Sequence, residues 1–382
     1  MYHISTLNKI SPAGLNCLSA EYIITEDVNK ADGILVRSQD MHEMEFSGEL
    51  KAIARAGAGV NNIPLDRCAE KGIVVFNTPG ANANAVKELV LCGLFLAARN
   101  VPSALTWAKG LTEDVSKQVE KGKSQFAGHE IMGKTLGIIG LGAIGRKVAS
   151  SAKALGMEIA GYDPYYTSGG EGISVYTDLK EMLAICDFVT LHLPATDSTK
   201  GMINKEMFDA MKDGAVLLNF SRDKLVKDMD LAAALESGKV SQYVTDFPND
   251  NLVGFDNVIL LPHLGASTEE AEDNCAVMAV EQMRDYFENG NIINSVNFPR
   301  VNMGPFHSGC RLAVMMKNSN NPVIDLTYML RDAEIPVTRV IGGRRDDGIS
   351  YLLVSVAGEL KDEIIFGGEK GANIISIRKI EK

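Results

Sequence analysis

The run GIIGLGAIGRKVA, residues 137–149, constrains the fold of this chain more than any other feature. Its glycines Gly140, Gly142 and Gly145 follow an apolar strand-like segment and precede a helix-like one. In this pattern the first glycine permits a tight turn, the second lets backbone approach a pyrophosphate, and the third allows helix and strand to pack closely. The helix N-terminus also offers unpaired N–H groups to phosphates. The run therefore predicts a dinucleotide-binding βαβ unit, with a purely structural turn as the alternative.

A carboxylate after the next strand narrows the choice of cofactor. Asp163 follows the segment EIAGY, close to the spacing of about 20 residues expected after the first glycine. A carboxylate there accepts hydrogen bonds from ribose hydroxyls and repels a 2′-phosphate. The sequence therefore favours NAD over NADP.

Alternation of strand-like and helix-like segments predicts an α/β fold with three parts. We expect a flavodoxin-like, doubly wound substrate domain from residues 1–98 and 285–303, and a doubly wound Rossmann NAD domain from 99–284 with six strands between residues 136 and 261. The Pro- and Gly-bearing segment 297–309 is the best linker candidate. After it, residues 308–382 show a βαββαβ order that is typical of a ferredoxin-like module.

Composition excludes several classes of protein. The net charge of −11 disfavours nucleic acid as a partner, because nucleic-acid binders usually carry a basic surplus. No apolar stretch reaches the roughly 18 residues of a membrane span, and the N-terminus lacks a secretory signal. The six scattered cysteines contain no CxxC pair, so we expect reduced thiols, no metal site and a cytoplasmic location.

Two residues beyond the glycine run have the chemistry for hydride removal from a hydroxyl-bearing carbon. That reaction needs a base for the hydroxyl proton and a cation for an acid substrate's carboxylate. Arg222 follows the strand AVLLN, and His263 follows the strand NVILL. Both stand at carboxyl ends of predicted strands, where open α/β sheets bind ligands. We expect them to form the catalytic site.

Seven segments give the first 300 residues a strong resemblance to the D-isomer-specific 2-hydroxyacid dehydrogenases: RAGAGVNNIP, NTPGANANAVKELV, GKTLGIIGLGAIG, YDP, LHLPATDSTKGMIN, NFSRDKLV and PHLGAST. VRS, RAGAGVNNIP and the C-terminal module are most similar to the branch that acts on D-3-phosphoglycerate. This resemblance implies NAD-dependent oxidation of that small anionic 2-hydroxy acid to 3-phosphohydroxypyruvate, the first step of L-serine biosynthesis. It also implies a homodimer or homotetramer.

The resemblance assigns roles to the catalytic residues. Arg222 would bind the substrate carboxylate and C2 oxygen, and His263 would take the C2 hydroxyl proton. The family usually places the partner of this histidine as Glu in a DVFxxEP-like stretch, whereas this chain has the shorter TDFPND. Asp250 is therefore the expected partner, with a loop aspartate of no catalytic part as the alternative. Asp246 resembles the family's aspartate for the nicotinamide carboxamide.

The resemblance also implies larger binding sets. The expected cofactor-binding residues are Gly140, Gly142, Ala143, Ile144, Gly145, Asp163, Pro194, Phe220, Ser221, Arg222, Asp246, His263, Leu264, Gly265 and Ala266. The expected substrate-binding residues are Arg37, Ser38, Arg55, Gly57, Ala58, Gly59, Asn82 and Arg222.

Some candidates have a plainer interpretation beside the functional one. Arg37 and Arg55 each follow an apolar run, and either one alone could be a surface charge, but two in matching motifs favour a phosphate pocket. His192 is expected to support the site rather than transfer protons. The run Ser267–Glu270 fits a helix capping box better than a catalytic pair of glutamates.

The C-terminal module resembles an ACT-type domain, which implies an amino-acid effector. Its turn reads NSNNPVIDL, so Val323 stands where relatives have glycine, and a Cβ there obstructs close approach of a ligand. A purely oligomerising role is equally open. For the whole chain the alternatives are a glyoxylate or hydroxypyruvate reductase, an NADH-sensing interaction protein and a regulatory amino-acid-binding protein. Arg222 and His263 argue against the last two.

Overall fold

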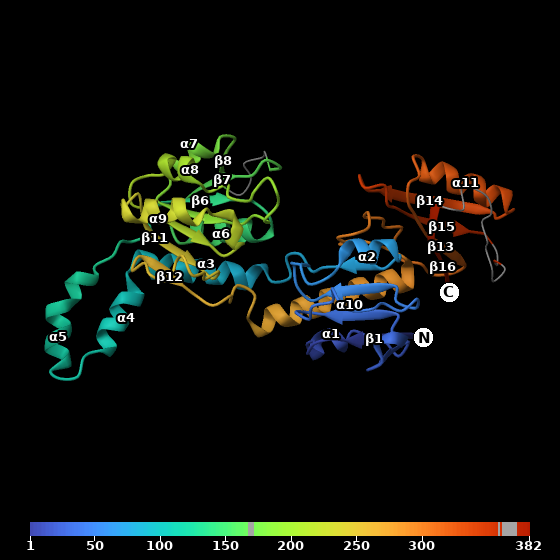
Figure 1. The fold of residues 1–382 in the computed structure, drawn as a ribbon, viewed down its shortest axis with the longest axis horizontal. Helices are drawn as coiled ribbons and strands as arrows, with labels where there is room; N and C mark the ends of the chain where they lie inside the picture. Colours follow the sequence, from blue (N-terminus) through green and yellow to red (C-terminus); the bar gives the residue numbers. More distant parts are fainter. Residues whose placement is uncertain (167–171, 358–359, 361–372) are drawn as a thin grey trace. The chain divides into compact units, whose positions relative to one another are not determined.

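The computed structural model describes residues 1–166, 172–357, 360 and 373–382 (Figure 1). The chain divides into two compact units. The first unit comprises Met1–Asn82 and Glu272–Lys382, and the second unit comprises Ala83–Ala271. The predicted three-domain boundaries stay a prediction.

The first unit contains a parallel sheet in the order β2-β1-β3-β4-β5, the flavodoxin-like order that the sequence predicts. Residues 33–36 and 52–54 are all buried, as expected of parallel strands covered on both faces. Its strands are β1 (Tyr2–Thr6), β2 (Tyr22–Ile24), β3 (Gly33–Val36), β4 (Ala52–Arg55) and β5 (Val74–Phe76). Its covering helices are α1 (Pro12–Leu15), η1 (Val28–Lys30), α2 (Leu65–Glu70) and most of α10 (Glu269–Asn289).

A second sheet in the first unit is antiparallel, in the order β14-β15-β13-β16. Its elements are β13 (Cys310–Met316), α11 (Pro322–Asp332), β14 (Val337–Arg344), β15 (Ser350–Val356) and β16 (Ile374–Glu381). This order is compatible with the expected ferredoxin-like module. The second helix of the βαββαβ pattern, predicted over 360–366, lies outside the described residues apart from Leu360.

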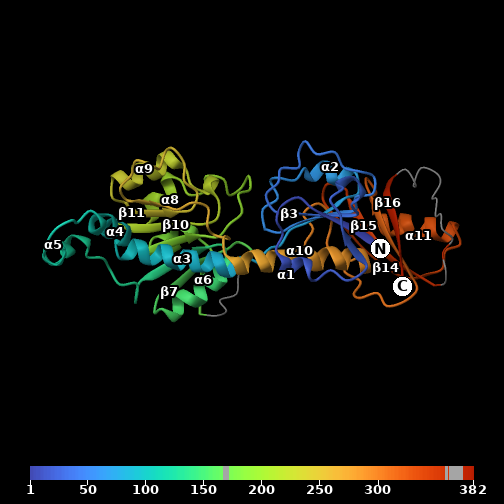
Figure 2. The same cartoon turned by 90° about the horizontal axis from the view of Figure 1, so that it is seen from below.

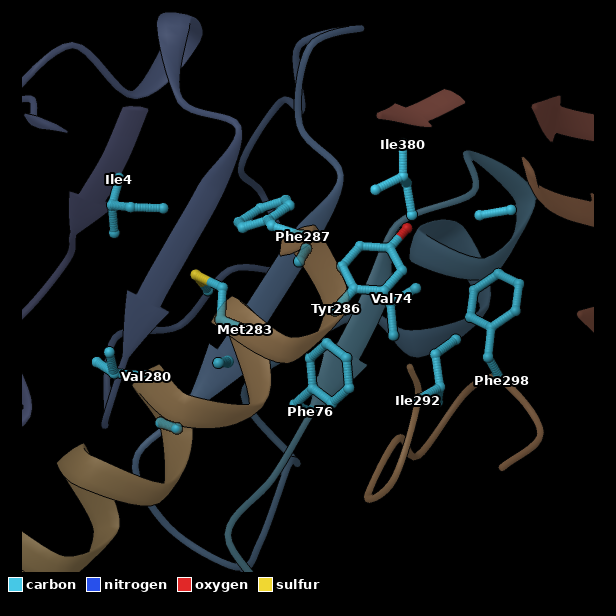
Figure 3. Packing of buried hydrophobic residues seen from close by; sticks show 14 of the residues in the cluster. Ile4, Val74, Phe76, Val280, Met283, Tyr286, Phe287, Ile292, Phe298 and Ile380 are labelled. Atoms are coloured by element: carbon cyan, nitrogen blue, oxygen red, sulfur yellow. The ribbon is translucent and has the colours of Figure 1, made fainter. Parts of the chain in front are cut away.

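The two sheets of the first unit share one hydrophobic core around α10 (Figure 3). The helix contributes Val280, Met283, Tyr286 and Phe287, and Ile380 of β16 lies beside the Tyr286 ring (Figure 3). The predicted linker 297–309 is itself packed into this core, with buried side chains at Phe298, Val301, Met303 and Phe306. The C-terminal sheet is therefore an integral part of the first unit.

The second unit contains a seven-stranded parallel sheet in the order β12-β11-β10-β9-β6-β7-β8. Figure 2 labels the neighbouring strands β10 and β11 of this sheet. The six predicted strands are confirmed as β6 (Thr135–Ile139), β7 (Glu158–Tyr162), β9 (Phe188–Leu191), β10 (Ala215–Asn219), β11 (Val240–Thr245) and β12 (Val258–Leu260). The sequence missed β8 (Ser174–Tyr176), a three-residue edge strand that is too short for a clear pattern. The connecting helices are α6 (Ala143–Ala154), α7 (Leu179–Leu183), α8 (Lys205–Ala210), η3 (Asp223–Leu225) and α9 (Asp228–Glu236).

The second unit begins with α3 (Ala83–Ala98), whose buried face packs into a core that includes Leu136, Leu218 and Phe220. After it come α4 (Val101–Lys109), α5 (Val115–Gly122) and η2 (Lys123–Phe126). In the described part of the chain no single helix is long and apolar enough to cross a membrane, although α3 and α4, bent by 68°, meet that test together.

Candidate cofactor and substrate sites

The predicted cofactor and catalytic residues gather at one edge of the second unit's sheet. All strands of this sheet run parallel, so their carboxyl ends share that edge. One candidate follows each of six strands, and in chain order these are Gly140, Asp163, His192, Arg222, Asp246 and His263.

Each glycine of the motif has a distinct structural reason. Gly140 has φ +98°, and a Cβ there would collide with the carbonyl oxygen of His192. A Cβ at Gly145 would collide with the carbonyl oxygen of Gly140, so this glycine sets how closely α6 approaches the strand. A Cβ at Gly142, by contrast, would meet no atom within 4 Å. Space beside Gly142 at a helix N-terminus without a side-chain cap fits a cradle for a pyrophosphate.

Asp163 ties this loop to the neighbouring strand. One carboxylate oxygen accepts a hydrogen bond from the backbone N–H of Leu141 (2.8 Å), and the other accepts from Tyr165 (2.9 Å). The carboxylate is thus held beside the glycine loop, where it can accept further hydrogen bonds from ribose hydroxyls.

The loop after β10 holds Arg222 half-buried. The buried Asn219 side chain donates to the carbonyl oxygen of Arg222 (2.8 Å), and the Ser221 hydroxyl donates to the carbonyl oxygen of Leu191 (2.6 Å). The Arg222 guanidinium donates to the carbonyl oxygen of Ser221 (2.6 Å) through one nitrogen, Nη1. The backbone is fixed, while the rest of the guanidinium keeps donors for an anionic ligand.

His263 is exposed and packs against the ring of Phe247, with ring centroids 4.7 Å apart. Asp246, which is 1% exposed, accepts a hydrogen bond from the N–H of Gly265 (2.9 Å) through Oδ2. Burial raises the pKa of Asp246, while the hydrogen bond from Gly265 and the charge of His263 act in the opposite direction. Its Oδ1 is buried and has no hydrogen-bond partner within the described residues. Such an orphaned acceptor fits an amide donor such as a carboxamide.

The structure does not join Asp250 to His263. Asp250 is exposed, and no hydrogen bond or ion pair links it to His263 in the part of the chain that the structure describes. The physical reason lies in its neighbours, because the side chains of Asn249 and Asn251 both donate to Asp228 (3.2 and 3.0 Å) and anchor this turn on α9. Asp246 is instead the carboxylate that interacts electrostatically with His263.

His192 and the start of α10 are two further features that the sequence singled out. The Nε2 atom of His192 lies 3.1 Å from the Thr190 hydroxyl, and burial lowers the pKa of His192 to about 3, so the ring is neutral near pH 7. The predicted capping box is wrong by one residue. Thr268, rather than Ser267, caps α10 by accepting a hydrogen bond from the N–H of Ala271 (3.1 Å).

The remaining predicted cofactor residues also lie in the second unit, with Phe220 and Gly265 buried and Pro194, Ala143 and Leu264 exposed. The predicted substrate residues other than Arg222 lie in the first unit. A Cβ at Gly57 would collide with the guanidinium of Arg55. The side chain of Asn77 donates to the carbonyl oxygen of Ala58 (2.7 Å), which fixes the loop that includes Gly59. Asn82 is half-buried.

Arg37 and Arg55 are brought together at the carboxyl ends of β3 and β4. Val36 is the register partner of Arg55, and the Nε of Arg55 donates to the carbonyl oxygen of Arg37 (3.0 Å). The Oδ1 of Asn8 accepts from three successive N–H groups, those of Arg37, Ser38 and Gln39 (3.1, 2.9 and 3.0 Å). The guanidinium of Arg37 forms an ion pair with Glu272 of α10 (2.7 Å).

Asn8 and Glu272 both contact Arg37, and the sequence did not reveal either contact. Both contacts join residues far apart in the chain, so no local spacing signals them. The sequence indicated only that two arginines at strand ends require hydrogen-bond or acidic partners when no ligand is bound.

The chain is similar to known dehydrogenases. Residues 95–265 match the family model of the D-isomer specific 2-hydroxyacid dehydrogenase, NAD binding domain. A D-3-phosphoglycerate dehydrogenase from Haemophilus influenzae is 34% identical over 340 residues, covering 85% of this chain and 80% of that protein. One from Methanocaldococcus jannaschii is 37% identical over 319 residues, covering 79% of this chain. The chain spans only 59% of the length of that second relative.

Solved structures give the same fold. A 3-phosphoglycerate dehydrogenase with bound NAD⁺ from Entamoeba histolytica is 28% identical, with a TM-score of 0.64 over 78% of this chain and 98% of that one. An NADPH-dependent glyoxylate/hydroxypyruvate reductase from Sinorhizobium meliloti is 25% identical, with a TM-score of 0.68 over 79% of this chain and 100% of that one.

Proposed function

The chain belongs to the D-isomer specific 2-hydroxyacid dehydrogenase family, and we propose that it oxidises D-3-phosphoglycerate to 3-phosphohydroxypyruvate with NAD. In a cell this reaction would be the first step of L-serine biosynthesis. The observation that carries the proposal is the common sheet edge of Arg222 and His263 with the glycine loop and Asp163. This edge offers a dinucleotide cradle and the two groups that a 2-hydroxy acid requires.

The proposed chemistry assigns one task to each residue. Arg222 binds the substrate carboxylate and the C2 oxygen through its remaining guanidinium donors. His263 accepts the C2 hydroxyl proton, and its ring is held in place against Phe247. When bound, NAD supplies the acceptor for the hydride of C2. The buried Oδ1 of Asp246 would accept a hydrogen bond from the nicotinamide carboxamide.

Asp163 supports NAD as the cofactor, even though the structurally similar reductase from S. meliloti is NADPH-dependent. Its carboxylate is fixed beside the glycine loop by two hydrogen bonds. A 2′-phosphate at the ribose would face this negative charge, whereas a 2′-hydroxyl can donate to it.

Arg37 and Arg55 support the proposal that the substrate carries a phosphate, because they lie together at one edge of the first unit's sheet. A second candidate function is reduction of glyoxylate or hydroxypyruvate, and one observation favours it. Arg37 already has an anionic partner in Glu272, as it would in an enzyme whose substrate lacks a phosphate.

Finer assignments complete the proposal. The C-terminal antiparallel sheet would be an ACT-type domain that takes an amino-acid effector or serves in homo-oligomer formation, and the protein would act in the cytoplasm. The strand order β14-β15-β13-β16 supports the assignment of an ACT-type domain.

The test is to incubate the purified chain with NAD, D-3-phosphoglycerate and a trap for the keto product, and to follow NADH. We expect turnover, and we expect His263→Ala to lower kcat by roughly 10²- to 10⁴-fold, the usual contribution of a positioned general base. His129→Ala, an exposed histidine of the same unit, is the control and should leave kcat unchanged. No oxidation by the parent chain together with good reduction of hydroxypyruvate would select the second candidate.

A further inference from the structure

The ion pair between Arg37 and Glu272 places a carboxylate on one of the two arginines proposed to bind the substrate phosphate. The two charged groups are 2.7 Å apart, and both side chains are partly open to solvent, with 38% and 44% of their surface exposed. A substrate phosphate can therefore reach this pair from solution. The phosphate would meet an arginine, Arg37, whose charge is already paired with the Glu272 carboxylate.

The surroundings fix both members of the pair. The backbone of Arg37 is held by the Oδ1 of Asn8 and by the Nε of Arg55. Glu272 lies in the first turn of α10, and the next residue, Asp273, accepts a hydrogen bond from the Ser11 hydroxyl. The helix and the strand end are thus pinned independently, so the contact between the two side chains results from the fold.

From this geometry we infer that the Glu272 carboxylate occupies the phosphate position at Arg37 and sets how tightly the site binds phosphorylated substrates. Substrate phosphate exchanges with the carboxylate for the Arg37 guanidinium, and the two anions repel each other while both are near it. The inference rests on the proposed function for the identity of the substrate, but its phosphate-binding part stands on the ion pair alone.

The expected effect is modest because the pair is exposed. Exposed ion pairs are weak, so removing the competing charge should strengthen phosphate binding roughly twofold to fivefold, which corresponds to about 0.4–1 kcal/mol. An unphosphorylated 2-hydroxy or 2-keto acid does not engage Arg37 through a phosphate. Its KM should not change. Glu272 is therefore a specificity-determining residue. Its substitution should change KM for phosphorylated substrates and leave KM for unphosphorylated substrates unchanged.

The experiment compares Glu272→Gln with Asp273→Asn in the full chain. The control removes the same charge one residue away, from a carboxylate whose partner is Ser11. Inorganic phosphate is titrated into the protein without cofactor by calorimetry, and KM is then measured for 3-phosphoglycerate and for hydroxypyruvate. We expect Glu272→Gln to bind inorganic phosphate and 3-phosphoglycerate two- to fivefold more tightly, with KM for hydroxypyruvate unchanged and Asp273→Asn like the parent.

Three results would overturn the inference: weaker phosphate binding by Glu272→Gln, which would make Glu272 a support for Arg37; an equal gain in Asp273→Asn, which would make the effect one of general charge; or no change in either variant. Adding Arg37→Ala to Glu272→Gln should abolish the gain. Tighter phosphate binding by Glu272→Gln in a chain that does not oxidise 3-phosphoglycerate would refute the proposed function and leave this inference intact.

Discussion

At the scale of single residues, the proposed cofactor site contains polar atoms that the protein itself leaves unsatisfied. The Oδ1 of Asp246 and the Nδ1 of His192 are buried without hydrogen-bond partners among the described residues. Leaving such groups unpaired costs about 1–3 kcal/mol each, so their retention at the sheet edge that also carries the glycine loop is consistent with a site that a ligand completes.

His192 should make the stability of the protein depend on pH. Its pKa is lowered from 6.5 to about 3 in the folded chain, because burial disfavours the charged ring. The unfolded chain binds a proton at this residue as pH falls through 6.5 and the folded chain does not, so stability is retained above pH 6.5 and lost between 6.5 and about 3. We expect the parent chain to lose about 2 kcal/mol more than His192→Gln between pH 6.5 and 5.

Chemical denaturation at the two pH values measures this difference. Glutamine keeps a nitrogen near the position of Nε2, which lies 3.1 Å from Thr190, and His129→Gln is the exposed control that should match the parent. Equal pH dependence in the parent and His192→Gln would show that the ring titrates normally in the folded protein.

The sequence predicted the positions of residues that depend on local geometry and missed the contacts between residues far apart in the chain. Asp163 follows its strand at a spacing set by the βαβ unit, and it is held where predicted. Asp250 was a plausible partner for His263 by chain position, yet no contact joins the two among the described residues, and Asn249 and Asn251 anchor the turn to Asp228. Such side-chain contacts across the fold have no signature in a single sequence.

At the scale of elements, the periodic strands were predictable and the short edge strand was not. β7 and β10 match their predicted segments, since buried parallel strands are continuous apolar runs. β8 has three residues, two of them half-buried and one exposed, so nothing distinguishes it from a loop.

The turn into α6 contains one glycine that we expect to matter for binding, Gly142, and one that we expect to matter for folding, Gly145. Ala at Gly142 fits open space at φ −73°, so we expect Gly142→Ala to keep or slightly raise the melting temperature while weakening NADH binding at least tenfold. Gly145→Ala should lower the melting temperature itself, because the Cβ collides with the carbonyl oxygen of Gly140. Thermal melts and NADH fluorescence titrations test both. Unchanged NADH affinity in Gly142→Ala would show that the cofactor does not bind at this turn.

At the scale of the whole molecule, the sequence suggested a C-terminal module on a linker, whereas the structure builds it into the first unit. Tyr351 donates to the carbonyl oxygen of Gly290 (2.6 Å), and Arg311 donates to that of Asn289 (2.6 Å). Both contacts satisfy carbonyl groups at the C-terminal end of α10, which a helix leaves unpaired. Composition marked the segment 297–309 as a linker, but could not show that its apolar side chains enter a shared core.

Arg378 of β16 is the residue through which this shared core can be tested. It donates to the carbonyl oxygens of Phe287 (2.9 Å) and Tyr286 (2.5 Å), and its guanidinium lies 4.3 Å from the centre of the Tyr286 ring. Arg378→Met keeps much of the side-chain volume but leaves these carbonyls unpaired, which should cost about 1.5–3 kcal/mol. For a unit of this size that corresponds to a fall of roughly 3–12 °C in melting temperature.

Scanning calorimetry of the full chain distinguishes a shared core from a separately folded module. If the core is shared, Arg378→Met lowers the melting temperature of the first unit as a whole. That unit includes the parallel sheet, in which the ring of Tyr2 stacks on Phe287 with ring centroids 4.7 Å apart. Arg331→Met, which removes an exposed arginine whose partners among the described residues are its neighbour Asp332 and the Tyr328 ring, should leave that transition in place. A new low-temperature transition confined to the C-terminal strands, with the parallel sheet melting as in the parent, would show instead that the two sheets unfold independently.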